Sequence, residues 1–263
     1  MTSPWPGVHR WRLLHSPPAD GPTNMAIDHS LVTRAARSGE AVIRVYSWAV
    51  PTLSLGRNQR ARGCYDLGAI AERGIAVVRR PTGGRAILHH REVTYSVTAP
   101  LPPDEPLART YARFNGMLIA ALRQLGVDAQ LAAPIAATPL PGLAPCFDSP
   151  ARGEVEWHGR KLAGSAQWRD GSALLQHGSI LVDDDQWLLA TLTRETVAPP
   201  AAATLRDALG HAPTTADLAD ALATAAAAAF GTPPEPLAAG APDAQPEAAL
   251  VRLYCDDNWT WRR

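Results

Sequence analysis

Residues 79–97 read RRPTGGRAILHHREVTYSV, and this stretch decides the fold. The stretch covers all or part of three short β-prone runs, at residues 75–80, 86–90 and 93–99. The first two runs are separated by PTGG at residues 81–84, a sequence typical of a turn or loop. We therefore predict an antiparallel meander of three strands that carries a glycine loop.

The rest of the chain alternates between helical and strand patterns. Apolar residues recur at helical spacing in residues 24–37 and 111–125, and residues 215–230 are rich in alanine, so all three segments are predicted to be helices. Further strands are predicted at residues 41–48, 51–59 (a strand or loop), 154–157, 161–168, 173–182 and 249–254. Strand meanders with helices between them predict an α+β fold with a largely antiparallel sheet, not a parallel βαβ series.

Composition restricts the class of protein. A length of 263 residues fits one large domain or two small ones, and a formal net charge of +0 gives no general attraction to nucleic acid or to an anionic membrane. The three cysteines are widely spaced and include no CxxC pair, which favours neither disulfides nor a zinc site. Without an apolar run of signal-peptide or membrane-span length, we expect a cytoplasmic protein. Ala/Pro-rich connectors are predicted at residues 132–145, 198–203 and 231–246.

The glycine loop is the first candidate for chemistry. Two adjacent glycines, Gly83 and Gly84, let the backbone approach a ligand and leave N–H groups for a carbonyl or phosphate. Neighbouring arginines add positive charge. Any Gly-Gly hairpin fits this description, however, so the loop alone does not identify a function.

The second candidate is the single lysine of the chain, Lys161. The other 24 of the 25 Lys+Arg residues are arginine. A buried ammonium can lose its proton and a guanidinium cannot, so a site that needs a tunable base or a compact charge cannot use arginine. Chance is the alternative explanation for one lysine.

Several segments of this chain resemble the biotin/lipoate protein ligase superfamily, and they occur in the same order. The glycine-loop string is one, and the others lie at residues 24–28, 51–59, 159–167 and 253–259. This resemblance, which runs from about residue 24 to residue 259, implies a single catalytic domain over residues 1–263. It also implies a class II synthetase-like mixed sheet flanked by helices.

Within the superfamily, the loop distinguishes two chemistries. ATP-dependent lipoate ligases usually carry a third glycine and then a His-Asp pair, whereas this chain has Arg85 and His90 at those positions. The Gly-Gly-Arg-Ala form resembles octanoyl-[acyl carrier protein]:protein octanoyltransferases, which use a cysteine and no ATP. The segment APCFDSP, with Cys146, resembles the part that bears their nucleophile, and Lys161 matches their partner lysine.

The resemblance therefore implies acyl transfer without a cofactor or a metal. The donor would be octanoyl-acyl carrier protein, and the acceptor a lysine of a lipoyl-domain protein, either the glycine cleavage H protein or a 2-oxoacid dehydrogenase E2. A thiol has a pKa of about 8.5, and a nearby ammonium lowers it, which would make Cys146 a nucleophile. The alternative is that Cys146 is a small buried hydrophobic residue. Cys64 and Cys255 match no active segment and are expected to be structural.

Substrate contacts are expected from the glycine loop, the lysine segment and the strand after it. The residues are Arg79, Arg80, Gly83, Gly84, Arg85, Ala86, His89, Ala163, Gly164, Ser165, Ala166, Gln167, His177 and Gly178. His89 and His90 would face opposite sides of a strand, which disfavours a shared metal site. Residues 183–185 are expected in an exposed loop, and Arg57, Arg60 and Arg62 on a solvated face that is an alternative docking site for an acidic carrier.

Three other functions remain open from the sequence. An ATP-dependent lipoate ligase is one, and a lipoyl amidotransferase that relays the acyl group between lipoyl domains through the same cysteine is another. The third is a catalytically silent lipoyl-binding module.

Overall fold

A computed structural model describes residues 5–132, 153–194 and 202–263. The strands are β1 (Arg10–His15), β2 (Glu40–Tyr46), β3 (Thr52–Leu55), β4 (Ala76–Arg79), β5 (Ile87–His89), β6 (Glu92–Pro100), β7 (Gln130–Leu131), β8 (Val155–Trp157), β9 (Arg160–Asp170), β10 (Ala173–Leu181) and β11 (Glu235–Pro236). The helices are α1 (Gly21–Ser38), α2 (Leu67–Glu72), α3 (Leu107–Gln124), α4 (Leu188–Leu192), α5 (Leu205–Leu209), α6 (Thr215–Phe230), η1 (Pro242–Ala244), α7 (Ala248–Cys255) and α8 (Asp257–Thr260).

Two sheets form the centre of the molecule. The larger has eight strands in the order β11-β1-β2-β6-β10-β9-β8-β7, and the smaller has the order β4-β3-β5. From β2 to β7 all neighbours in the large sheet are antiparallel, whereas β1 is parallel to both β2 and β11. The α+β class with a mixed, largely antiparallel sheet is confirmed. Among the described residues, no helix is long and apolar enough to cross a membrane.

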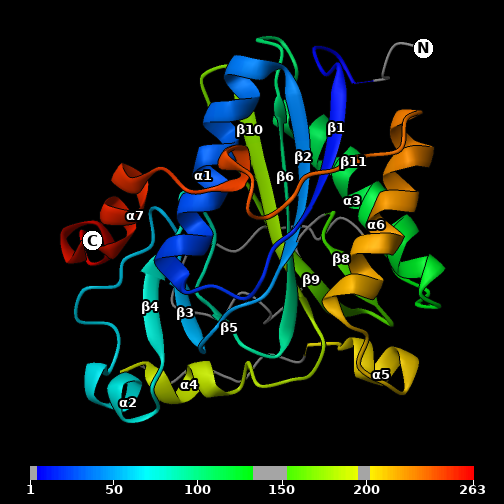
Figure 1. The fold of residues 1–263 in the computed structure, drawn as a ribbon. Helices are drawn as coiled ribbons and strands as arrows, with labels where there is room; N and C mark the ends of the chain where they lie inside the picture. Colours follow the sequence, from blue (N-terminus) through cyan, green and yellow to red (C-terminus); the bar gives the residue numbers. More distant parts are fainter. Residues whose placement is uncertain (1–4, 133–152, 195–201) are drawn as a thin grey trace.

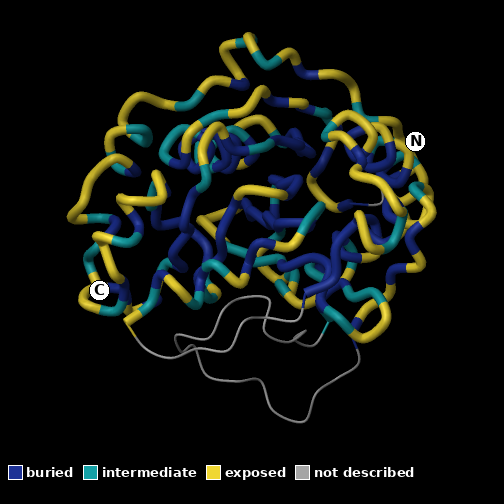
Figure 2. The backbone as a smooth tube through the Cα atoms, turned by 90° about the horizontal axis from the view of Figure 1, so that it is seen from below, coloured by how far each residue is buried: buried dark blue, intermediate teal, exposed yellow. Residues whose placement is uncertain are grey.

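Helices cover both faces of the large sheet (Figure 1). On one face α3 and α6 pack together over an apolar core, in which Trp11 stacks on Phe230 with ring centroids 3.9 Å apart. On the other face lie α1 and the small sheet. In Figure 2 buried backbone runs through the middle of the molecule, and most of the exposed backbone lies around it.

Strand β6 shows how different the two layers are. Its residues Val93, Tyr95 and Val97 belong to the apolar core, because alternate residues of a strand point to the same face. The residues between them are polar, and Thr94 and Ser96 are buried on the opposite face. The layer between the large sheet on one side and α1 with the small sheet on the other is therefore buried and polar. This layer holds much of the candidate site.

The predicted meander around the glycine loop is wrong. Strands β4 and β5 do not pair with each other, because each pairs with an opposite edge of β3, and β6 lies in the large sheet. The side chain of Arg80 favours this arrangement, because its guanidinium donates both to the carbonyl of Ser54 in β3 and to that of Gly83 in the loop, each at 2.9 Å. The loop closes around this group and does not form a tight turn. The second meander, from β8 to β10, is confirmed.

The three predicted helices are confirmed as α1, α3 and α6, and β3 lies within the predicted segment 51–59. The predicted final strand at 249–254 is wrong, since these residues form α7. Leu250, Val251 and Tyr254 pack in one cluster with Met25 of α1, which a helix allows because residues three and four apart share a face. Of the predicted connectors, residues 231–246 contain β11 and η1.

Candidate functional site

The glycine loop is organised by its carbonyl groups, which point toward arginine donors. Arg80 Nη2 donates to the carbonyls of Gly83 at 2.9 Å and Arg85 at 2.7 Å. The N–H of Arg57 donates to the carbonyl of Thr82 at 2.8 Å. These bonds hold the loop from the protein side, so its N–H groups are not needed for its fold.

The two glycines keep their N–H groups available. Within the described chain, neither Gly83 nor Gly84 donates its N–H to a protein acceptor. Gly84 is exposed and has φ +97°, and a Cβ there would lie 2.7 Å from Arg80 Nη2. A Cβ on Gly56 would lie 2.0 Å from the Gly84 carbonyl oxygen. Close backbone packing therefore requires glycine here and leaves two donors for a ligand oxygen.

Arg79 joins the loop region to the end of the chain. Its buried guanidinium donates to the carbonyls of Gly56 at 2.6 Å, Gln59 at 2.9 Å and Thr260 at 2.8 Å. Burial, assisted by nearby arginines, lowers the pKa of Arg79 to about 10, so it stays charged at neutral pH. These bonds give Arg79 a structural role; its predicted contact with substrate stays a prediction.

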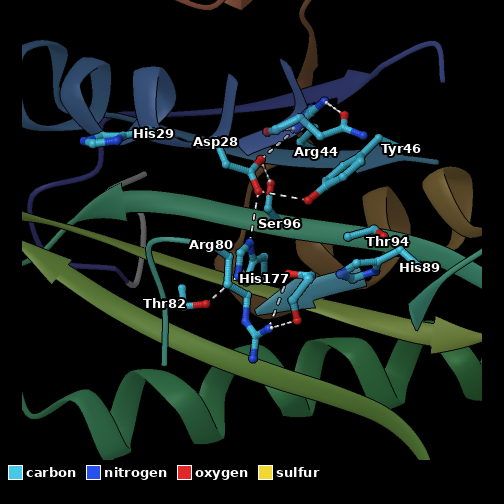
Figure 3. Close-up of polar contacts among 12 residues, drawn as sticks. Asp28, His29, Arg44, Tyr46, Arg80, Thr82, His89, Thr94, Ser96 and His177 are labelled. Atoms are coloured by element: carbon cyan, nitrogen blue, oxygen red, sulfur yellow. Dashed lines mark hydrogen bonds and ion pairs between the residues drawn. The ribbon is translucent and has the colours of Figure 1, made fainter. Parts of the chain in front are cut away.

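Figure 3 shows a buried network around Asp28 that includes His177. The carboxylate of Asp28, on α1, accepts from Arg44 Nη1 at 2.8 Å, from Ser96 Oγ at 2.8 Å and from Tyr46 OH at 3.0 Å. His177 Nδ1 lies 3.2 Å from the same carboxylate. The four partners come from β2, β6 and β10, so Asp28 ties α1 to three neighbouring strands.

His177 connects this network to the loop, because its Nε2 lies 2.6 Å from the hydroxyl of Thr82. Burial works to raise the pKa of Asp28, but Arg44 and His177 bring it below its usual value. Burial lowers the pKa of His177, against the pull of Asp28. An ionised Asp28 beside a neutral His177 fixes the tautomer: Nδ1–H donates to Asp28, and Nε2 accepts from the Thr82 hydroxyl.

His89 belongs to a second buried network, centred on Glu92. His89 Nδ1 lies 2.6 Å from Glu92 Oε1, and the hydroxyls of Thr94 and Ser179 donate to the same carboxylate. The His89 ring stacks on Trp48 with centroids 4.0 Å apart. This arrangement orients His89 at the buried interface of the two sheets. Contact with an acyl chain stays a prediction.

The single lysine is buried and paired. Lys161, 3% exposed, donates from Nζ to Glu154 Oε1 at 2.7 Å. The carbonyl of Lys161 accepts from the N–H of Ala203, while the neighbouring Ala202 packs against Ile87. The lysine segment therefore lies near the strand that follows the glycine loop. Cys146 lies outside the described residues.

The remaining predicted residues lie on β9, on β10 and beside the loop. Ser165 Oγ lies 2.8 Å from Tyr95 OH, and the Gln167 amide lies 3.0 Å from the hydroxyl of Thr110. Gly178 is opposite Ser165, and a Cβ there would lie 2.7 Å from the Tyr95 ring. Of the other predicted residues, Ala86, Ala163 and Gly164 are buried and Ala166 is half-buried.

The sequence interpretation missed Asp28 and Glu154 as members of polar pairs. The signal for Asp28 was its spacing from Asn24, since two polar residues four apart lie on the buried face of α1. The expected exposed loop at residues 183–185 is wrong for Asp185, which is 5% exposed because its carboxylate binds His90 Nδ1 at 2.7 Å. His90 follows the end of β5 and is exposed, whereas His89 is buried. No group of three or more potential metal ligands gathers among the described residues.

Comparison with known proteins identifies the class. Residues 20–227 match the lipoyl protein ligase A/B catalytic domain. Octanoyltransferase LipM of Kyrpidia tusciae is 40% identical over 280 residues, which cover 97% of this chain and 100% of that protein. Octanoyltransferase LipM of Symbiobacterium thermophilum is 38% identical, with coverage of 96% and 98%.

Solved structures agree on the fold. A lipoate-protein ligase A bound with ATP superposes with a TM-score of 0.78 at 19% identity, covering 96% of this chain and 98% of that chain. A bipartite lipoate protein ligase from Thermoplasma acidophilum, described with its E2 lipoyl domain, gives a TM-score of 0.73 at 20% identity, with coverage of 97% and 96%. The chain belongs to the lipoyl protein ligase A/B catalytic domain family. It is an acyltransferase.

Proposed function

We propose that this chain is an octanoyltransferase of protein lipoylation. It takes octanoyl from octanoyl-acyl carrier protein and passes it to a lipoyl-domain lysine through a thioester on Cys146. The relatives that cover nearly the whole chain are octanoyltransferases by name, which supports the acyl group. The Thermoplasma acidophilum ligase forms a lipoylation system with an E2 lipoyl domain, which supports the class of acceptor.

The observation that carries the proposal is the buried Lys161–Glu154 pair. Next to Glu154, Gly153 donates its N–H to the carbonyl of Ala132 at 3.3 Å, and Ala132 donates to the carbonyl of Glu154 at 2.8 Å. Residues 132 and 153 flank the segment with Cys146, so this segment begins and ends beside the partner of Lys161. Cys146 is seven residues before Gly153, and seven extended residues span at most about 25 Å.

The proposed reaction has two steps. The Cys146 thiolate attacks the thioester carbonyl carbon, a new C–S bond forms, and the bond to the carrier sulfur breaks; the carrier thiolate takes a proton from the Lys161 ammonium and leaves as a thiol. The acceptor amine then attacks the Cys146 thioester, loses its proton to the Lys161 amine, which is now neutral, and leaves an amide and the Cys146 thiolate. The N–H groups of Gly83 and Gly84 are placed on a loop whose carbonyls are already bonded, which suits donors to the oxyanion of each step.

The proposal includes one catalytic domain over residues 1–263 and a cytoplasmic location, for which the widely spaced cysteines are the support. It includes no cofactor, because a thioester arrives activated and its transfer to an amine is favourable without ATP. The residues expected to contact substrate are those named from the sequence, with Cys146 and Lys161 as the catalytic pair.

The test is incubation with octanoyl-acyl carrier protein and a lipoyl domain, followed by intact mass of both proteins. We expect the acceptor to gain one octanoyl group without ATP, and Cys146→Ala to abolish the gain while its unfolding midpoint stays near that of wild type. Cys64→Ala is the matched control and keeps activity. Acylation only from free octanoate or lipoate with ATP would instead identify a ligase, and transfer only from an octanoylated lipoyl domain would identify an amidotransferase.

A further inference from the structure

Thr82 is the point at which the exposed glycine loop is fastened to the buried core. Its side chain is 0% exposed, whereas Gly84, two residues later, is exposed. Its carbonyl accepts from Arg57, and its hydroxyl binds His177 across 95 residues of sequence. The position of Thr82 determines where the backbone enters the glycine loop. The residues that hold Thr82 therefore also determine the direction of the N–H groups of Gly83 and Gly84.

The holder is rigid because Asp28 has its partners in place on every side. Arg44 supplies the balancing positive charge, with Nη1 2.8 Å from Asp28 Oδ1, and the hydroxyls of Tyr46 and Ser96 donate hydrogen bonds to the same carboxylate. All of these side chains are buried. A buried carboxylate with an arginine and three further partners strongly resists reorientation, because any displaced donor would lose its bond without gaining water.

We propose that Asp28 and His177 are positioning residues for acyl transfer: through the Thr82 hydroxyl they fix the direction of the N–H groups of Gly83 and Gly84. This inference rests on the proposed function. Asp28 keeps Nδ1 of His177 protonated, so Nε2 has a lone pair that accepts only from a hydroxyl in one orientation. The hydrogen bonds run from Arg44 to Asp28, from Asp28 to His177 and from His177 to Thr82, which begins the loop.

The expected size of the effect follows from how oxyanion donors work. Such donors act only when they lie about 2.7–3.1 Å from the developing oxyanion, and loss of one costs roughly a hundredfold to a thousandfold in kcat. A displaced donor retains part of its effect. We therefore expect loss of the Thr82 hydroxyl to lower kcat by about tenfold to a hundredfold, with little change in KM for the carrier.

The experiment compares Thr82→Val with Thr82→Ser and with Thr98→Val. Thr82→Val removes the hydroxyl with little change in volume, and Thr82→Ser restores it. Thr98 is the matched control, since it is a buried threonine on the same face of β6 as Thr94 and Ser96, and its hydroxyl has no partner among the described residues. Single-turnover octanoyl transfer should fall only in Thr82→Val, while all three variants keep an unfolding midpoint close to that of wild type.

Two further measurements separate positioning from general stability. Nitrogen-15 NMR of the histidine rings, with His177 assigned from a His177→Gln variant, should show the neutral Nδ1–H tautomer in wild type. In a double-mutant cycle, His177→Gln and Thr82→Val together should slow transfer no more than the stronger single change. Additive losses, an Nε2–H tautomer, or a Thr82→Val variant as fast as wild type would each overturn the inference. A wild-type protein without any octanoyl transfer would overturn the proposed function instead.

Discussion

The two layers that sandwich the large sheet are built from the same strands and differ in kind. On the side of α3 and α6 the buried residues are apolar, and stacked rings such as Trp11 and Phe230 fill the space. On the side of α1 and the small sheet, two carboxylates, Asp28 and Glu92, are buried among donors. An apolar layer tolerates many arrangements of similar volume, whereas a bonded layer allows one. The difference indicates that the first layer supplies stability and the second supplies geometry.

The largest expected effect tests the apolar layer. Phe230→Ala removes a fully buried ring between Trp5, Trp11 and Phe114, so it should lower the free energy of unfolding by about 3–5 kcal/mol. Urea unfolding measures this loss. Under conditions where the variant is still folded, octanoyl transfer per folded molecule should match wild type. A drop in kcat comparable to that of Thr82→Val would contradict the division between the layers.

Sequence reasoning reached the apolar layer and only part of the polar one. Helix α6 was predicted from an alanine-rich run with the bounds that the structure has, and a capping threonine and a terminal glycine set those bounds. The glycine loop and Lys161 were found because their residue types are unusual. Asp28 and Glu154 were not, since a carboxylate is expected to be solvent-exposed until the arginine or lysine that pairs with it is known.

The same limit explains the errors of topology. Periodicity marks a run as a strand but does not say which strand it joins, so β4 and β5 were paired with each other. Arg80 favours the pairing with β3, because its buried guanidinium binds Ser54 of that strand as well as the glycine loop. Tertiary contacts also decided α7, where an eight-residue run with β-branched and aromatic residues folds as a helix against α1.

The next effect sharpens the comparison, because Lys161 and Glu154 form a buried charged pair at the edge of the apolar side. Lys161→Ala should raise the pKa of the Cys146 thiol, and Glu154→Gln should lower it, since the ammonium then acts without a compensating carboxylate. Each shift should be about one pH unit, or ~1.4 kcal/mol. Lys161→Arg should keep part of the electrostatic effect and lose most of the transfer to the amine.

The measurement is the rate of cysteine alkylation against pH. Cys64 and Cys255 are at least partly accessible and would react as well, so both are replaced by alanine in every variant. Shifts of the same sign in Lys161→Ala and Glu154→Gln would mean that fold damage, not charge, moves the profile. Identical profiles in all variants would mean that Lys161 does not act on Cys146.

The smallest expected effect is a pH dependence of stability that belongs to the polar layer alone. His177 faces Asp28, Arg80 and His89, and burial lowers its pKa from the ordinary value of 6.5. As the pH falls below 6.5, the unfolded chain binds this proton before the folded protein does, so the free energy of unfolding decreases. The contribution is present above pH 6.5 and is lost as the pH falls through the folded pKa.

Unfolding free energies between neutral pH and pH 5 test this slope in wild type, His177→Gln and Phe230→Ala. His177→Gln should flatten part of it, and Phe230→Ala should keep the wild-type slope at a lower overall stability. His29, whose pKa burial also lowers, accounts for some of the remainder, so His29→Gln is the matched control and should remove a separate share. If His177→Gln retained the full slope, His177 would not be a neutral group held by Asp28. The tautomer on which the positioning of Thr82 depends would then be wrong as well, so this weakest effect bears directly on the geometry of the site.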